Sequence, residues 1–379
     1  MPAARVFNRW LLDPPSEPGR PHAYVWEEPT GVGLLERLRT EAELQSVGRS
    51  RFSGTLKHRN AMWRHYRTFL RQALSNFRVA LTVENRSASL LYYYAMLNFG
   101  KAELLRTRGA PVLGPVSHGL SFSPTKAKSV SGDYLTVRDG VFPMLYKDRT
   151  GYEMPVGARL PIARLLGRIP EIAEQLTTLD VGTPEVSGVL QLIAFDHSNA
   201  WVLLAVSPTD ALEPTTASGK YLRRFFRQVD PPRDWRDRFG VSRRWKSMSF
   251  YESVVSFPYT AGDDAGAFTA GVKATGYTWS VKDLLGLSTM RTFDAWLSPS
   301  LYRTRMFPMP PAMARYAMTY YASSLVRYRP SMFDTEVSPT QAYLFDALAR
   351  ECAVPMLIDT LSALTGIDSL FLSPGALRL

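Results

Sequence analysis

The sequence of 379 residues is almost without cysteine. Cys352 is its single one, so no intrachain disulfide can form and a thiolate metal cluster is excluded. An uncharged apolar run of about 18 residues is also missing, which excludes an ordinary membrane-spanning helix. The N-terminal segment lacks the basic-then-apolar pattern of a secretory signal peptide. These absences favour a cytoplasmic protein that does not contact a membrane.

Several catalytic motifs are missing as well. The sequence contains no phosphate-binding Gly-x4-Gly-Lys-Ser/Thr loop, no complete Gly-x-Gly-x-x-Gly fingerprint, no HExxH and no GxSxG. An acidic residue never stands two positions before a lysine, which disfavours a metal-dependent nuclease of the restriction-enzyme kind. Five histidines and one cysteine, widely separated, make a zinc site improbable. We therefore expect no cofactor and no metal ion, which leaves metal-independent acid–base chemistry or no catalysis.

Helices dominate both ends of the sequence. Hydrophobic residues make up 45% of the chain and charged residues 21%, which is sufficient for a large buried core. Apolar residues at helical spacing predict helices over residues 33–47, 55–79 and 83–108 near the N-terminus. The same pattern predicts helices over residues 312–328 and 339–364 near the C-terminus, the second divided at Pro355.

The central part of the sequence has the alternation of β-strands. We expect a hairpin over residues 132–146 with its turn at Asp139-Gly140, and a second hairpin of residues 189–195 and 200–206. Further elements are predicted as two short helices within 161–176, a helix over 221–229, and strands over 247–259 and 271–280. The predicted fold is α+β, with helical N- and C-terminal parts (1–128 and 301–379) packed together and a mainly antiparallel sheet inserted (129–300), all in one integrated unit.

Positive charge is concentrated in two stretches. The net charge is +11, and residues 48–80 hold eight basic residues and no acidic one. Four arginines of that stretch recur at helical spacing and predict a basic ridge opposite the buried face of the helix: Arg64, Arg67, Arg71 and Arg78. A ridge of this kind can lie along a phosphate backbone.

The second stretch, residues 220–246, holds ten basic residues against three acidic ones, with aromatic residues interspersed. Arginine beside aromatic rings is typical of surfaces that bind phosphates and stack on unpaired bases. The candidate residues for binding RNA or single-stranded nucleic acid here are Arg223, Arg224, Arg227, Arg243, Arg244 and Trp245. The alternative is that these arginines cover a solvated face and that the aromatic residues belong to the core.

Arg59, Asn60 and His65 form a candidate catalytic group within the first basic stretch. Their R-N-x4-H spacing resembles the arginine-to-histidine motif of HEPN ribonucleases. In that family the arginine stabilises charge on the phosphate and the histidine moves the proton of the RNA 2′-hydroxyl, without a metal. The resemblance implies metal-independent RNA cleavage. A structural role, or generic contact with phosphate, is the alternative.

A longer resemblance covers about a third of the chain. The segments SASLLYYYAMLNFGKAELL, SHGL and GDYLTVRDGVFPMLY, then near the end MPPAMARYAMTYYASSLVRYRPSMFD and QAYLFDALARECAVPMLIDTL, are similar to the YaaC-like protein family of bacteria. The family has no settled activity, so the resemblance implies a helical core and an intracellular protein. The matched positions are Tyr93, Tyr94, Asn98, Lys101, Ala102, His118, Gly119, Arg327 and Tyr328.

Three hypotheses for the function are compatible with these patterns. The first is a nucleic-acid-associated protein, in its finer form a metal-independent ribonuclease that serves RNA metabolism or phage defence. The second is a non-catalytic interaction or scaffold subunit, in which tyrosine-rich helices bind a protein partner or a second copy of the chain. The third is a small-molecule enzyme that uses His118 and Lys101. His118 is in each case either a functional residue or a hydrogen-bonded anchor beside the helix of residues 92–105.

Overall fold

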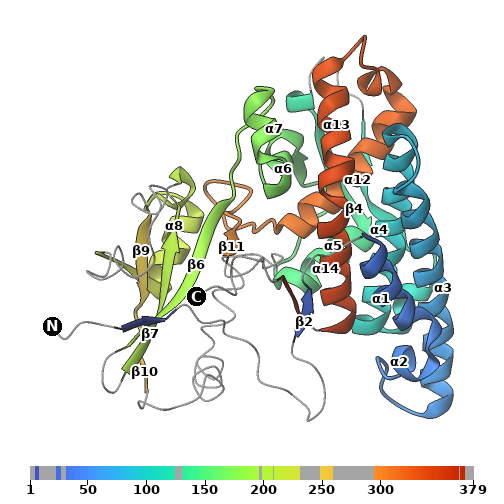
Figure 1. Cartoon of the computed structure of the whole chain (residues 1–379), viewed down its shortest axis with the longest axis horizontal. Helices are drawn as coiled ribbons and strands as arrows, with labels where there is room; N and C mark the ends of the chain where they lie inside the picture. The colour runs from blue at the N-terminus through green and yellow to red at the C-terminus, as the bar shows by residue number, and fades with distance from the viewer. Residues whose placement is uncertain are drawn as a thin grey trace. The chain divides into compact units, whose positions relative to one another are not determined.

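The computed structural model describes residues 5–7, 23–26, 31–123, 130–195, 199–207, 209–230, 248–258, 294–366 and 368–371. The chain divides into two compact units, both drawn in Figure 1. The helical unit comprises residues 29–184 and 311–366, and the sheet unit comprises residues 1–28, 185–310 and 367–379. These limits differ from the boundaries expected from the sequence, because residues 130–178 pack on the helices.

The helical unit is built on two long antiparallel helices. Helix α3 (Leu56–Ala80) and helix α4 (Asn85–Arg108) run side by side, as Figure 1 shows. The Thr55 side chain caps α3 by accepting a hydrogen bond from the amide of His58, and Gly109, with φ of +71°, ends α4. Both helices match the prediction closely. They form because their apolar residues recur at helical spacing and share one buried face.

The remaining helices cover this pair. N-terminal helices α1 (Gly31–Glu43) and α2 (Gln45–Arg49) replace the single predicted helix over 33–47, with a break at Leu44. Helix α12 (Pro311–Tyr328) packs on α4, and α14 (Ala353–Thr365) packs on α1 and α4. Helix α13 (Pro339–Glu351) ends before Cys352, so the predicted division lies three residues before Pro355. N- and C-terminal helices therefore pack together, as the α+β prediction requires.

A small sheet and several short helices complete the helical unit. The strands β3 (His118–Phe122), β4 (Tyr134–Gly140) and β5 (Arg159–Pro161) form an antiparallel sheet in that order. Helices α6 (Ile162–Leu166) and α7 (Ala173–Thr178), with the 3-10 turns η1 (Ala110–Leu113), η2 (Val130–Gly132), η3 (Pro170–Ile172) and η6 (Pro330–Phe333), connect the larger elements. The two short helices predicted within 161–176 are confirmed.

The hairpin predicted over residues 132–146 is wrong in its second half. Strand β4 pairs with β3 and β5, and helix α5 (Val141–Thr150) begins directly after it. Val141, Phe142, Leu145 and Tyr146 are buried at the spacing of one helical face. Pro143 lies in the first turn of α5, where its missing amide hydrogen costs little. The Asp139-Gly140 pair therefore marks a strand-to-helix junction, since only glycine adopts the φ of +146° found at Gly140 without strain.

The sheet unit contains an antiparallel sheet with the strand order β1-β6-β7-β9-β8, together with β10 on β7 and β11 on β6. Strands β6 (Ser187–Phe195) and β7 (Asn199–Val206) form the predicted hairpin, whose turn residues lie outside the described ranges. The other strands are β1 (Arg5–Phe7), β8 (Phe226–Val229), β9 (Ser249–Ser253), β10 (Phe257–Pro258) and β11 (Asp294–Leu297). The strand predicted over 271–280 lies outside the described residues. Near the chain ends, β2 (Ala23–Trp26) pairs in parallel with β12 (Asp368–Phe371).

The helix predicted over residues 221–229 is wrong beyond Phe225. Helix α8 (Ala217–Phe225), preceded by the turn η4 (Asp210–Leu212), ends there, and β8 begins at the next residue. The strand forms because residues 226–229 pair with β9, which satisfies backbone groups that a short continuing helix would leave at its end. In the described part of the chain, no helix has both the length and the apolar character needed to cross a membrane.

Candidate functional site

The basic ridge of α3 faces acidic residues that the sequence stretch itself does not contain. Glu43 of α1 accepts hydrogen bonds from Arg67 at 2.9 Å and from Arg71 at 2.6 and 2.7 Å, and Glu36 pairs with Arg78 at 3.2 Å. The hydrogen bond from Arg71 is the main reason that the pKa of Glu43 falls to about 2. Glu43 therefore stays charged at neutral pH. Three of the four ridge arginines are paired within the fold.

Arg64, the fourth arginine of the ridge, is exposed on α3. It lies one residue before His65, which is exposed as well. Among the described residues, neither side chain forms an ion pair, unlike Arg67, Arg71 and Arg78.

The structure separates the residues of the predicted catalytic group. Arg59 is half-buried, and its buried Nε has no hydrogen-bond partner among the described residues. Asn60 accepts hydrogen bonds from Gln45 and Arg49, each at 3.4 Å, whereas His65 is exposed. Six residues of α-helix turn the direction of a side chain by about 120°. Arg59 and His65 thus leave α3 in different directions, which the linear spacing alone does not reveal.

Only the beginning of the second basic stretch lies in the described residues; Arg243, Arg244 and Trp245 lie outside them. Arg223, Arg224 and Arg227 are all exposed on α8 and β8. The Arg223 guanidinium donates to the carbonyls of Leu212 and Gly219, at 3.0 and 3.2 Å. That of Arg224 lies 5.5 Å from the ring centroid of Phe225. Arg227 pairs with Glu252 at 2.6 Å, so its charge is partly neutralised.

A distant segment adds two arginines to this surface. The amide of Ala217 donates to the carbonyl of Arg303 at 2.8 Å, and the amide of Ser300 donates to Ser218 Oγ at 2.7 Å. These bonds fix residues 300–303 against the N-terminus of α8. We call the residues of these two segments the arginine–aromatic surface: Arg223, Arg224, Arg303 and Arg305 with Phe225 and Tyr302. Phe307 lies buried beneath it.

Arg305 is the most closely stacked member of the arginine–aromatic surface. Its guanidinium lies 4.3 Å from the Tyr302 centroid and 5.7 Å from that of Phe307. Arg303 pairs with Glu213 at 3.0 Å. Neither arginine is among the residues predicted from the sequence, because both lie far beyond the basic stretch of residues 220–246. The sequence feature that could have indicated them is the pair of arginines directly after a tyrosine in Tyr302-Arg303-Thr304-Arg305.

His118 lies in a group of aromatic side chains from three separate segments. Its ring centroid is 4.9 Å from that of Tyr320 on α12 and 6.2 Å from that of Tyr93 on α4. Tyr93 lies 5.3 Å from Tyr320 and 5.2 Å from Tyr94. Arg327 and Tyr328 end the same helix α12, with the guanidinium 5.6 Å from the Tyr328 ring. We call these residues the tyrosine–histidine cluster: Tyr93, Tyr94, His118, Tyr320, Arg327 and Tyr328.

The electrostatic environment keeps His118 neutral. Burial, and then the nearby positive charge of Arg327, lower the pKa of His118. The amide of Leu120 donates to Nδ1 at 3.3 Å, so the neutral ring carries its proton on Nε2. Burial likewise raises the pKa of Tyr93 and of Tyr320, so both keep their hydroxyl protons. The half-buried His118 is thus a neutral hydrogen-bond donor beside a cation.

Three other residues that match the family pattern lie beside His118 or on α4: Gly119, Asn98 and Lys101. Gly119, with φ of +84°, comes directly after His118, and a Cβ there would lie 2.5 Å from Pro143 Cδ. Asn98 donates to the Tyr94 carbonyl at 2.9 Å, one turn along α4. The ammonium of Lys101 lies 5.8 Å from the centroid of the Phe69 ring on α3. Lys101 thus contacts α3.

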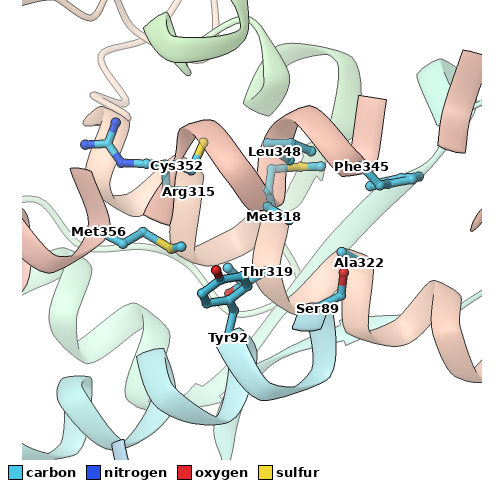
Figure 2. A pocket seen from close by; sticks show the side chains of 11 residues that line it. Ser89, Tyr92, Arg315, Met318, Thr319, Ala322, Phe345, Leu348, Cys352 and Met356 are labelled. Carbon is cyan, nitrogen blue, oxygen red and sulfur yellow. The ribbon is translucent and has the colours of Figure 1, made fainter. Parts of the chain in front are cut away.

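A small cavity lies in the core of the helical unit, between α4, α12, α13 and α14. Figure 2 shows Tyr92, Met318 and Met356 gathered around it, while the guanidinium of Arg315 extends away from them. Its volume of about 30 Å³ holds roughly two water molecules. Cys352 also lines it, and burial raises the pKa of that thiol. The cavity is too small for an organic ligand, and the cysteine is an unreactive thiol.

Comparison with known proteins identifies the family of the chain. The family model described as "YaaC-like Protein" matches residues 51–345. This range includes α3, the arginine–aromatic surface, the tyrosine–histidine cluster, all of α12 and the first part of α13. No curated protein and no solved structure matches the chain. The family resemblance seen in the sequence is therefore confirmed, whereas a similarity to HEPN ribonucleases is not shown.

Proposed function

The chain belongs to the YaaC-like protein family, and starting from this membership we propose that it binds single-stranded nucleic acid through its arginine–aromatic surface. The observation that carries the proposal is the stacking of exposed guanidinium groups on aromatic rings, at Arg224 and above all at Arg305. Guanidinium groups bind phosphates with two parallel hydrogen bonds, and aromatic rings stack on bases of any sequence.

The charges of this surface favour a polyanion. In the described part of the chain, neither Arg224 nor Arg305 pairs with a carboxylate, whereas Arg67, Arg71 and Arg78 of α3 do. A paired arginine loses its carboxylate partner when it binds phosphate, which reduces the net gain. Arg224 and Arg305 carry no such cost. They are therefore better phosphate ligands than the paired arginines of the α3 ridge.

The test is the salt dependence of binding. Fluorescence anisotropy of a labelled single-stranded RNA, measured between about 50 and 200 mM NaCl, gives the slope of log affinity against log salt. Replacing Arg223, Arg224 and Arg305 together with alanine is expected to reduce this slope by about 2, because each lost phosphate contact on a single strand contributes about 0.7.

A matched control removes the same total charge elsewhere. Arg39, Arg108 and Arg350 are arginines in pairs with carboxylates of the helical unit and lie outside the α3 ridge, and their triple alanine variant is expected to keep the slope. Equal slopes for the two triple variants would show that general charge, and not the arginine–aromatic surface, attracts the nucleic acid. An intact chain that binds no nucleic acid at low salt would reject the proposal and favour the scaffold hypothesis.

The finer form of the proposal is RNA cleavage by Arg59 and His65 without a metal. It rests on their motif and on the exposure of His65, next to Arg64, on α3. The same proposal includes that such a ribonuclease serves RNA metabolism or phage defence. The side chains of Arg59 and His65 leave the helix about 120° apart. Cleavage therefore requires that the substrate or a second chain places a phosphate between them.

A further inference from the structure

Four rings of the tyrosine–histidine cluster form a continuous series: Tyr94, Tyr93, Tyr320 and His118. Tyr328 belongs to the cluster through Arg327, which lies over its ring. Tyr93 and Tyr320 are buried, at 4% and 6% exposure, whereas Tyr94 and Tyr328 are exposed by 42% and 57%. The exposed ring of Tyr94 lies 5.2 Å from Tyr93, which in turn contacts Tyr320 and His118. The buried rings hold the exposed one against a packed support. Such a ring stacks on a ligand with little loss of conformational freedom.

Arg327 differs from its neighbours on the same stretch of chain. Arg315 pairs with Glu171 and Asp359, and Arg329 pairs with Asp133 at 2.8 Å. Arg327 is exposed, donates to the carbonyl of Ser323 and lies over Tyr328. Within the described ranges it has no carboxylate partner. Its positive charge is thus available to an anion beside exposed aromatic rings.

The chemistry of the cluster matches one ligand class. A planar heterocycle stacks on tyrosine, a phosphate pairs with arginine, and a ring nitrogen or carbonyl oxygen can accept a hydrogen bond from Nε2–H of a neutral histidine. A nucleotide carries all three groups in one molecule. An inorganic anion uses only Arg327, and a purely apolar ligand uses only the rings.

We propose that the tyrosine–histidine cluster is a separate binding site for one nucleoside monophosphate unit, free or within a strand, with its base on Tyr94 or Tyr328 and its phosphate on Arg327. The inference deepens the proposed function and rests on it for the strand-bound form of the ligand. It concerns different residues, in the helical unit, and so it can fail or hold independently of the arginine–aromatic surface.

The experiment is calorimetric titration of the full chain with AMP, adenosine and inorganic phosphate. AMP is expected to bind, and Tyr94→Ala and Tyr328→Ala together are expected to weaken binding by roughly 5- to 150-fold, the range for one lost base stack. Tyr94→Phe with Tyr328→Phe keeps both rings and is expected to restore binding to within about twofold of the unmodified chain. Arg327→Gln is expected to weaken AMP binding and to leave adenosine binding unchanged.

Tyr343→Ala is the matched control, because this tyrosine is also exposed, by 50%, but belongs to α13 and is not a member of the cluster. A second titration, with a short oligoadenylate, compares the strand-bound ligand with free AMP. If the Arg223, Arg224 and Arg305 variant loses oligoadenylate binding but keeps AMP binding, the two sites are distinct, as proposed.

Three results would overturn the inference. The first is no binding of AMP or oligoadenylate to the intact, folded chain. The second is equal affinity for phosphate and AMP, which would show an anion site without base stacking. The third is AMP binding that the tyrosine and Arg327 variants leave unchanged. Suppose the cluster variants leave AMP binding unchanged, but replacing Arg223, Arg224 and Arg305 lowers the salt slope. The proposed function is then supported and the nucleotide site is rejected.

Discussion

Arg315→Met is expected to lower the free energy of unfolding by about 3–5 kcal/mol, because it breaks a buried ion network by removing one partner. Arg315 is fully buried on α12 and donates to Glu171 at 2.9 Å and to Asp359 at 2.6 Å. The attraction of these two carboxylates outweighs the burial of the guanidinium and raises the pKa of Arg315. Methionine fills a similar volume but removes the hydrogen bonds that Arg315 donates to both carboxylates.

Chemical denaturation followed by circular dichroism measures this loss. Arg350→Met is the control, because Arg350 pairs with Asp346 and Glu351 on the exposed side of α13 and its loss is expected to cost at most about 1 kcal/mol. Adding Asp359→Asn and Glu171→Gln to the Arg315 variant removes the two buried carboxylate charges that faced Arg315 and is expected to recover part of the stability. If Arg315→Met is no more destabilising than Arg350→Met, the network does not stabilise the fold.

RNA cleavage, in the ribonuclease form of the proposal, is expected to slow by roughly 10²- to 10⁴-fold in His65→Ala, since this is the usual contribution of a proton-transfer group. The RNA 2′-hydroxyl is the nucleophile in such a reaction. The products should therefore end in 2′,3′-cyclic phosphates, and DNA should not be cut. EDTA is expected to leave the rate unchanged. Gel analysis of a labelled RNA with time gives the rate for each variant.

His58→Ala is the control for this reaction, because His58 is a second exposed histidine on α3, seven residues from His65. Cleavage that stops with EDTA, or that persists equally in His65→Ala, would contradict the mechanism. If the folded chain cleaves no RNA, the salt-dependence measurement decides between the two remaining hypotheses. Binding of nucleic acid would indicate a non-catalytic nucleic-acid-binding protein, and no binding would favour the scaffold hypothesis.

Local patterns in the sequence determined the long helices and the central hairpin. The apolar spacing of α3 and α4, the stop at Gly109 and the pairing of β6 with β7 depend on interactions between residues close in the chain. Contacts of this kind appear in the sequence as regularly spaced apolar residues. The family resemblance rested on the same helices, and the match over residues 51–345 agrees with it.

Tertiary packing decided the structure of the segments directly after β4 and α8. Residues 141–146 were predicted as the second strand of a hairpin, but α5 forms because its apolar face packs on α4. Residues 226–229 continue a helical pattern, but they pair with β9 instead. In both segments the local preference is weak, and contacts with a distant element select between helix and strand.

The candidate sites depended on tertiary structure still more strongly. The sequence showed an acid-free basic stretch, but folding places Glu36 and Glu43 of α1 against its arginines. It showed His118, Tyr93 and Arg327 as separate matched positions, and folding brings α4, β3 and α12 together around them. Net charge and residue types are properties of composition and can be read directly. Which charges remain unpaired, and which rings meet, is set by long-range contacts that leave no periodic record in the chain.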